Sequence, residues 1–294
     1  MRFTEEQFAR FAASPSQTER DKMENAERAI KNAISASDKL RARNVRVFAQ
    51  GLYRNRVNVR EDSDVDIAVV CNNTFFWDGP DGSTADTFGI EPATYHFETF
   101  RAELGEALVN YFGQSAVDAG DKAFDIKANT YRVDADVAPF FPHRRYATNG
   151  THLDGVEMRT RAGRRIINWP DQHYDNGVAK NDRTGRSFKG CVRILKTLRY
   201  AMLNENIASA DGTSSFLMEC LIWNVPDGYL TYSTWSRSMR EAMAYLFNNT
   251  MTYEKCSDWG EVSELKYLFR GPQAWTWDSA HKFLSECWDY AGFE

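Results

Sequence analysis

Paired aspartates in the first third of the chain are the residues best placed to do chemistry. Asp64 and Asp66 stand one residue apart in the stretch DVDIAVV at positions 64–70, which has the pattern of a buried strand. Successive side chains of a strand point to opposite faces, so both carboxylates share one face while Val65 and Ile67 face a core. Two carboxylates about 4 Å apart repel each other by roughly 4 kcal/mol at an effective dielectric constant near 20. Either one of them takes a proton or cations lie between them, and the pair therefore suits a divalent metal.

A third carboxylate is expected on a neighbouring strand, in the stretch YRVDADVAP at positions 131–139. Asp134 and Asp136 share one face of this stretch, opposite Val133, Ala135 and Val137, and alternation alone does not choose between the two acids. Three acids on adjacent strands would hold two metal ions about 3.5–4 Å apart, one activating a hydroxyl group and the other holding a triphosphate. Because Mg²⁺ prefers a few carboxylates together with substrate phosphates, we expect two Mg²⁺ ions, with Mn²⁺ as the alternative.

A glycine turn precedes the paired aspartates. Gly51 follows a short strand expected near 45–49, and twelve residues separate Gly51 from Asp64. Backbone N–H groups of such a turn can bind phosphate. A strand, a glycine turn, a strand with paired aspartates and a third acidic strand, in that order, predict a nucleotidyltransferase-type site.

The elements that must position these residues indicate an α/β (α+β) core with a mixed sheet. The patterns predict helices at about 17–38 and 95–112, strands at 45–49, 64–70, 122–128 and 130–138, and a loop at 72–92. From about residue 171 onward the apolar spacing is helical. We therefore expect an N-terminal helix and nucleotidyltransferase core over residues 1–145, a mostly helical lobe over 146–294, and an active-site cleft between them.

Composition excludes several other classes of protein. Hydrophobic residues make up 43% of the chain, which is too many for a disordered protein. The chain has 36 Lys and Arg against 41 Asp and Glu, and this net charge of −5 argues against binding to DNA regardless of its sequence. No run of 18 apolar residues exists, so we expect no membrane span, and the N-terminus resembles no secretory signal. The five cysteines form no CxxC pair, which favours a reducing cytoplasm with the thiols in the core.

The stretch from Gly51 to Asp66, followed by Asp136-Val137-Ala138-Pro139, resembles the DNA polymerase β-like nucleotidyltransferase superfamily. Within it, the chain is similar to the bacterial cGAS-like CD-NTases, relatives of oligoadenylate synthase, over about residues 20 to 230. The similar stretches are 50–70, 133–140, 166–170 with His173 and Asn176, 180–181, 192–196 and 215–221.

The resemblance implies a role for each matching residue. The metal-binding acids would be Asp64, Asp66 and Asp136, since the third acid of the family precedes a hydrophobic pair and a proline. The nucleotide-binding residues would be Gly51 and Leu52 in the turn, Lys196 and Ser215 on the donor triphosphate, and Phe216 stacked on a base. Family members make cyclic di- or trinucleotides from NTPs and release pyrophosphate. In bacteria these products are second messengers that switch on anti-phage effectors (CBASS). Partner proteins such as HORMA or ubiquitin-ligase-like regulators would control the enzyme.

One position departs from the family. The glycine is normally followed by Ser, whose hydroxyl holds phosphate, whereas this chain has Leu52. A lost hydrogen bond to a charged group is worth about 1.5–3 kcal/mol, so Leu52 puts efficiency in doubt. Leu52 is the reason to keep one alternative open, a catalytically weakened nucleotide sensor. A linear nucleotidyltransferase acting on RNA or a small molecule is a second alternative, and the net charge of −5 weighs against a long RNA track.

A basic run lies between residues 180 and 199, where Asp182 is the single acid. It contains Lys180, Arg183, Arg186, Lys189, Arg193, Lys196 and Arg199. The run predicts a triphosphate funnel, a solvated helix face or an RNA-binding surface. We expect Arg193 and Lys196 to be functional and Arg183 and Arg186 to be solvated, while Asn55 and Asn58 shape the glycine turn or contact a ligand.

Overall fold

The computed structural model describes residues 1–59, 65–130, 134–271 and 273–293, and these form two compact units. The sheet unit lies within residues 16–51 and 63–170, and the helical unit within residues 1–15, 52–62 and 171–294. The sequence placed the boundary at residue 145, whereas the units divide at residue 170. The difference arises because two further strands after residue 145 continue the sheet to Asn168.

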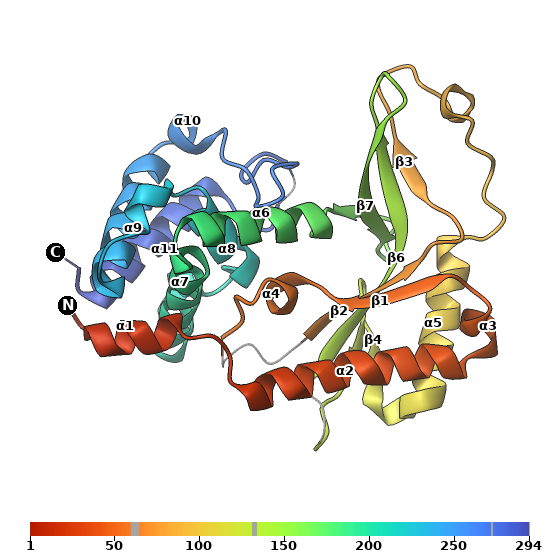
Figure 1. Ribbon diagram of the computed structural model, residues 1–294, viewed down its shortest axis with the longest axis horizontal. Helices are drawn as coiled ribbons and strands as arrows, with labels where there is room; N and C mark the ends of the chain where they lie inside the picture. The colour runs from red at the N-terminus through yellow and green to blue at the C-terminus, as the bar shows by residue number, and fades with distance from the viewer. Residues whose placement is uncertain (60–64, 131–133, 272, 294) are drawn as a thin grey trace. The chain divides into compact units, whose positions relative to one another are not determined.

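The sheet unit contains the expected mixed sheet. Its strands are β1 (Val45–Ala49), β2 (Val65–Cys71), β3 (Phe76–Asp78), β4 (Val117–Ala119), β5 (Phe124–Ile126), β6 (Ala135–Tyr146), β7 (His152–Arg159) and β8 (Arg165–Asn168). The order is β1-β2-β6-β5-β4, in which β2 and β6 are parallel and the other neighbours are antiparallel. The far half of β6 pairs with β3 and β7, and β7 pairs with β8 (Figure 1).

Helices cover this sheet because strand and helix each present an apolar face. In β2, Val65, Ile67 and Val69 are fully buried, as the alternation predicted. The helices are α2 (Gln17–Ala36), α3 (Asp38–Arg41) and α5 (Phe97–Phe112), and α2 packs against α5 and β1 (Figure 1). Ala26, Ile30 and other residues at helical spacing make the buried stripe of α2.

Three local features differ from the sequence expectation. The segment 72–92 contains β3 and a 3₁₀ turn at Ala85–Phe88 rather than loop alone. Strand β6 runs on to Tyr146, because its second half exchanges hydrogen bonds with β7. Helix α1 (Glu5–Ala12) was not foreseen, although Thr4 and Gln7 form a capping box at its start.

The helical unit is built around one apolar core. Its longer helices are α1, α6 (Pro170–Arg183), α7 (Ser187–Asn204), α8 (Ser215–Trp223), α9 (Trp235–Thr250) and α11 (Trp277–Ala291), with the short α10 (Tyr253–Cys256). The short α4 (Gly51–Arg54) and α6 each begin on the last residue of a segment of the sheet unit. The predicted stripe of Val192, Leu195, Leu198 and Met202 on α7 is fully buried. Among the described residues, no helix is both long and apolar enough to cross a membrane.

All five cysteines are buried free thiols, as expected for small core residues: Cys71, Cys191, Cys220, Cys256 and Cys287. Burial raises the pKa of the Cys191 thiol to about 12. At neutral pH this thiol is therefore protonated and behaves as an apolar group.

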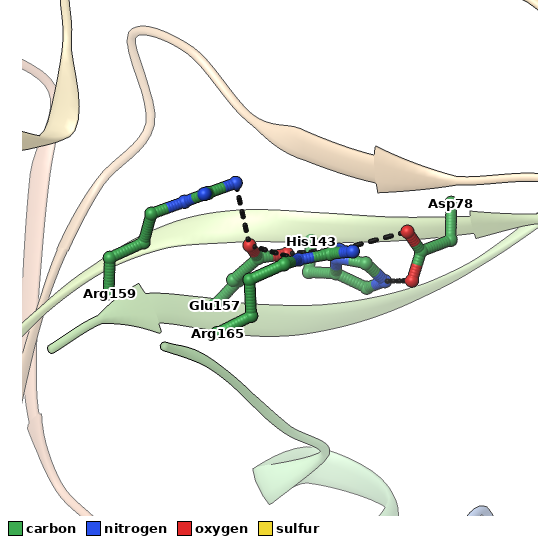
Figure 2. Close-up of polar contacts among 5 residues, drawn as sticks. All are labelled: Asp78, His143, Glu157, Arg159 and Arg165. Carbon is green, nitrogen blue, oxygen red and sulfur yellow. Dashed lines mark hydrogen bonds and ion pairs between the residues drawn. The ribbon is translucent and has the colours of Figure 1, made fainter. Parts of the chain in front are cut away.

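A buried ionic cluster joins four strands of the sheet unit (Figure 2). Glu157 on β7 and His143 on β6 are both fully buried, and His143 Nδ1 lies 2.9 Å from Glu157 Oε2. Arg165 on β8 donates to both carboxylate oxygens of Glu157, at 2.8 and 2.9 Å, and to Asp78 Oδ1 on β3 at 2.9 Å. The Arg159 guanidinium lies 3.5 Å from Glu157. The cluster therefore fastens β3, β7 and β8 to β6.

Replacing Glu157 with Gln is expected to destabilise the protein by about 3 kcal/mol at pH 7, because a buried charge network loses its central anion. Burial alone would raise the pKa of Glu157, but hydrogen bonds from His143 and Arg165 outweigh it and hold the pKa below its ordinary value. When folding lowers the pKa of a carboxyl group, its ionised form stabilises the folded protein at every pH above the pKa of the unfolded chain. This stabilisation is lost as the pH falls through the pKa of the folded protein. Urea unfolding between pH 3 and 7 should show a weaker acid dependence in Glu157→Gln than in the unchanged protein.

The matched control is Asp154→Asn on the same strand, whose mostly exposed carboxylate lies 3.3 Å from His152. We expect this change to cost less than about 1 kcal/mol, since exposed pairs are screened by solvent. An acid dependence of Glu157→Gln equal to that of the unchanged protein would contradict the assignment to Glu157.

Candidate functional site

Parallel pairing of β2 and β6 places two of the predicted acids next to each other. Asp66 on β2 is the register partner of Asp136 on β6, and both are half-buried. Partner residues on neighbouring strands project from the same face of the sheet. Asp64 and Val133 lie outside the described residues. The structure thus brings together Asp66 and Asp136 from segments 70 residues apart in the chain.

The structure also distinguishes Asp136 from Asp134, which alternation in the sequence left open. Asp134 precedes β6, and its Oδ1 accepts a hydrogen bond from the backbone N–H of Ala128 at 2.5 Å. Its carbonyl oxygen accepts from the Val65 N–H at 3.0 Å. Asp134 therefore holds two chain segments together, while the register next to Asp66 belongs to Asp136. The role of Asp136 as the third metal-binding acid stays a prediction.

Two further aspartates extend this row and were missed in the sequence. Asp125 on β5 is the register partner of Asp136, and Asp118 on β4 is the partner of Asp125. The signal was present, because the buried Phe124 and Ile126 flank Asp125 and direct it to the other face. Asp118 pairs with Lys127 at 3.1 Å on the surface. The row continues the acidic face across four strands.

Gly51 lies directly against Asp66. A Cβ atom built on Gly51 would lie 2.7 Å from Asp66 Oδ2, closer than real Cβ contacts allow. Gly51 also has φ +62°, a left-handed conformation that side chains disfavour. The Gln50 N–H donates to the Asp66 carbonyl oxygen at 2.8 Å, which fixes the turn to β2. The turn and the acidic strand are therefore one local structure, as the order of motifs predicted.

The carboxylates fit a divalent cation. Among the described residues, which do not include Asp64, no three or more His, Cys, Asp or Glu side chains come close enough together to hold a metal ion. Asp66 and Asp136 supply two carboxylates at one face, next to the Gly51 turn, where a Cβ would meet the Asp66 carboxylate. Mg²⁺ is bound in proteins by such a pair together with substrate phosphates and water.

The other predicted residues belong to the helical unit. Lys196 on α7 is fully buried, and its Nζ donates to the Val57 carbonyl oxygen at 3.1 Å. Its contact with the donor triphosphate stays a prediction. Ser215 is the first residue of α8, directly after the cap Ser214, whose hydroxyl accepts from the Leu217 N–H at 3.1 Å.

Phe216 is half-buried and packs between aromatic neighbours. Its ring centroid lies 5.6 Å from that of His173 and 5.9 Å from that of Trp275. The His173 ring in turn lies 3.1 Å, through Nε2, from Oε1 of the buried Glu219. These neighbours hold the Phe216 ring in place, and its stacking on a base stays a prediction.

The basic run between residues 180 and 199 does not form one continuous exposed surface, either for a triphosphate or for solvent. Four of its side chains are buried: Lys180, Lys189, Arg193 and Lys196. Lys180 binds the Val225 carbonyl oxygen at 2.7 Å and Asp227 at 2.9 Å, while Arg183 is exposed next to the same aspartate, as expected. The sequence pattern did not show this burial, because it depends on carbonyl groups that other segments bring to α6 and α7.

Comparison with known proteins agrees with this geometry. Residues 175–292 match the family described as the cGAS/DncV-like nucleotidyltransferase C-terminal helical domain. The chain is 39% identical to a cyclic dipyrimidine nucleotide synthase CdnE of Cecembia lonarensis, covering 99% of both chains. It is 41% identical to one of Legionella pneumophila, covering 97% of both.

A solved structure shows the same fold. It is the Elizabethkingia meningoseptica CdnE cyclic dinucleotide synthase with GTP and Apcpp, at a TM-score of 0.83 and 31% identity. The match covers 99% of this chain and 100% of that one. With this fold, with Asp66 and Asp136 in register beside Gly51, and with relatives alike over nearly their full length, the chain belongs to the cGAS/DncV-like nucleotidyltransferases (CD-NTases) and is a cyclic nucleotide synthase that uses NTPs.

Proposed function

We propose that this protein makes a cyclic dinucleotide from pyrimidine NTPs, as a second messenger of bacterial anti-phage defence in the cytoplasm. The observation that carries the catalytic part is the register of Asp66 and Asp136 beside the Gly51 turn. The choice of pyrimidines rests on the two cyclic dipyrimidine synthases at 39% and 41% identity. The relative solved with GTP is less similar, at 31% identity.

The proposed reaction joins a ribose hydroxyl oxygen of one NTP to the α-phosphorus of another. The bond from that phosphorus to the bridging oxygen breaks, and pyrophosphate leaves. A second transfer between the same two nucleotides closes the ring. Divalent cations, proposed as two Mg²⁺ or Mn²⁺, neutralise the charge of the triphosphate when bound.

The chain contributes positioning and electrostatics to this reaction. We assign cation binding to Asp64, Asp66 and Asp136, and orientation of the attacking hydroxyl to Asp136. The backbone of Gly51 and Leu52 is assigned to a phosphate of the donor. The remaining assignments are Lys196 and Ser215 to the donor triphosphate and Phe216 to a base.

Labelled NTPs test the proposed function. The protein is incubated with α-³²P-labelled ATP, GTP, CTP or UTP, singly and in pairs, with Mg²⁺ or Mn²⁺, and the products are treated with phosphatase before chromatography. A phosphatase-resistant product labelled from UTP or CTP alone is expected. A product labelled only from purine NTPs would overturn the pyrimidine assignment. Label on added RNA would indicate a linear nucleotidyltransferase instead, and NTP binding without pyrophosphate release would indicate a sensor.

Replacing Leu52 with Ser is expected to lower the KM for NTP by about tenfold, because a hydroxyl restores a hydrogen bond to a charged phosphate worth at least about 1.5 kcal/mol. Initial rates at varied NTP concentration measure the change. Leu52→Ala is the matched control, since it shortens the side chain without adding a donor. Equal KM values for the Ser and Ala variants would show that the hydroxyl contributes nothing at this position.

A further inference from the structure

We propose that Arg193 is a positioning residue for nucleotidyl transfer, because its guanidinium clamps the backbone that continues the Gly51 turn. The inference rests on the proposed function for its catalytic consequence. Its structural basis lies in the helical unit, in the segment 54–59, which begins at the last residue of α4.

The clamp is made by one buried side chain that binds two separate segments. Arg193 on α7 is only 7% exposed. Its Nε donates to the carbonyl oxygen of Ala12, the last residue of α1, at 2.7 Å, and its Nη1 donates to the Arg56 carbonyl oxygen at 2.7 Å. Both distances are short for N–H···O hydrogen bonds. A planar guanidinium offers several donors in a rigid fork, which a lysine ammonium does not.

The residue that Arg193 holds has a strained backbone. Arg56 has φ 56°, in the left-handed region that bulky residues rarely adopt. Such a conformation persists where the surrounding structure holds it in place. The hydrogen bond from Arg193 to the Arg56 carbonyl oxygen is a direct means of doing so.

Neighbouring contacts fasten the same segment at successive residues. Lys196, one helical turn after Arg193, donates to the Val57 carbonyl oxygen at 3.1 Å. The buried Asn55 reaches Glu219 Oε2 at 3.5 Å. The Arg54 guanidinium binds Asp171 at 2.7 Å. The Asn55 contact therefore ties this segment to α8.

The position of this segment matters for chemistry because of chain connectivity. Arg56 lies five residues after Gly51, and Gly51 lies against the Asp66 carboxylate with no room for a methyl group. A shift of the segment is therefore transmitted through the single turn of α4 to the phosphate-binding turn. Displaced N–H groups of that turn would bind the donor phosphate more weakly, which raises the KM for NTP.

Two variants that each remove one positive charge show whether the hydrogen bonds of Arg193 matter, or only the loss of a charge. Arg193→Met removes the donors and keeps the chain length, whereas Arg183→Met removes an exposed arginine that binds Asp227. Hydrogen–deuterium exchange of residues 51–59 and steady-state kinetics are measured for both. We expect Arg193→Met to speed exchange in 51–59 and raise the KM for NTP at least tenfold, and Arg183→Met to change neither.

A conservative variant guards against a failure to fold. Arg193→Lys keeps the charge but binds one carbonyl at a time, so exchange and KM should fall between those of the Met variant and the unchanged protein. A lower thermal midpoint for Arg193→Met or Arg193→Lys, with unchanged exchange in 51–59 and unchanged KM, would overturn the proposal in favour of a purely structural role. Absence of product from the unchanged protein would count against the proposed function, and exchange in 51–59 would still decide whether Arg193 holds the segment.

Discussion

Replacing Asp136 with Asn is expected to reduce cyclic nucleotide synthesis by about 10³-fold or more while the protein stays folded. Asp136 is the register partner of Asp66 on the parallel strand, so its carboxylate adds a second negative charge at the same face. An amide of nearly the same shape keeps the packing but loses the charge that attracts a divalent cation. Product formation from labelled NTPs measures the loss, and circular dichroism checks the fold.

Asp134→Asn is the control that the chain itself offers, two residues earlier in the same acidic stretch. Asp134 accepts the Ala128 N–H through Oδ1, and an asparagine oxygen can accept the same bond. We expect activity within about threefold of the unchanged protein, since the asparagine oxygen keeps this hydrogen bond. The reverse result, with Asp134→Asn inactive and Asp136→Asn active, would move the third acid to Asp134.

Replacing Gly51 with Ala is expected to lower kcat by about 10²-fold, the effect of displacing a catalytic group by about 1 Å. The added Cβ would lie 2.7 Å from Asp66 Oδ2, so either the turn or the carboxylate has to move. The φ of +62° adds strain of about 1–2 kcal/mol for a residue with a Cβ. Steady-state kinetics and thermal unfolding measure the two effects.

Gly82→Ala separates the strain from the contact with Asp66. Gly82 also has a positive φ, +81°, but a Cβ there meets no atom within 4 Å. It should lose a similar stability of about 1–2 kcal/mol and keep its activity. If Gly51→Ala and Gly82→Ala lost stability and activity to the same extent, the contact with Asp66 would have no catalytic meaning.

Much of the sheet unit could be predicted because its signals are local. Alternation located β1 and β2, and helical spacing located α2 and α5, each within a few residues of its observed bounds. The same alternation placed Asp66 on the face opposite Val65 and Ile67, and Asp136 on the face opposite Ala135 and Val137. Short elements such as β3 escaped, because three residues carry too little pattern to separate a strand from a loop.

The lysine and arginine residues of α6 and α7 show where sequence reasoning ends. On the sequence alone, Arg193 and Lys196 form part of a basic run that suits phosphate or RNA. In the structure both are buried and bind carbonyl groups of residues more than 130 positions away. A side chain's burial depends on which distant segments pack against it, and charge patterning contains no information about that.

By itself, the sequence predicted the parts of a nucleotidyltransferase-type site: a glycine turn, paired aspartates and a later acidic strand, in the order typical of nucleotidyltransferases. These follow from the alternation of side chains and the conformational freedom of glycine, which act over a few residues. Only the tertiary structure decided that Asp136 rather than Asp134 faces Asp66, and that Arg193 holds the chain beyond Gly51. Strand register and buried hydrogen bonds join residues far apart in the chain, so they are settled only when the whole core packs.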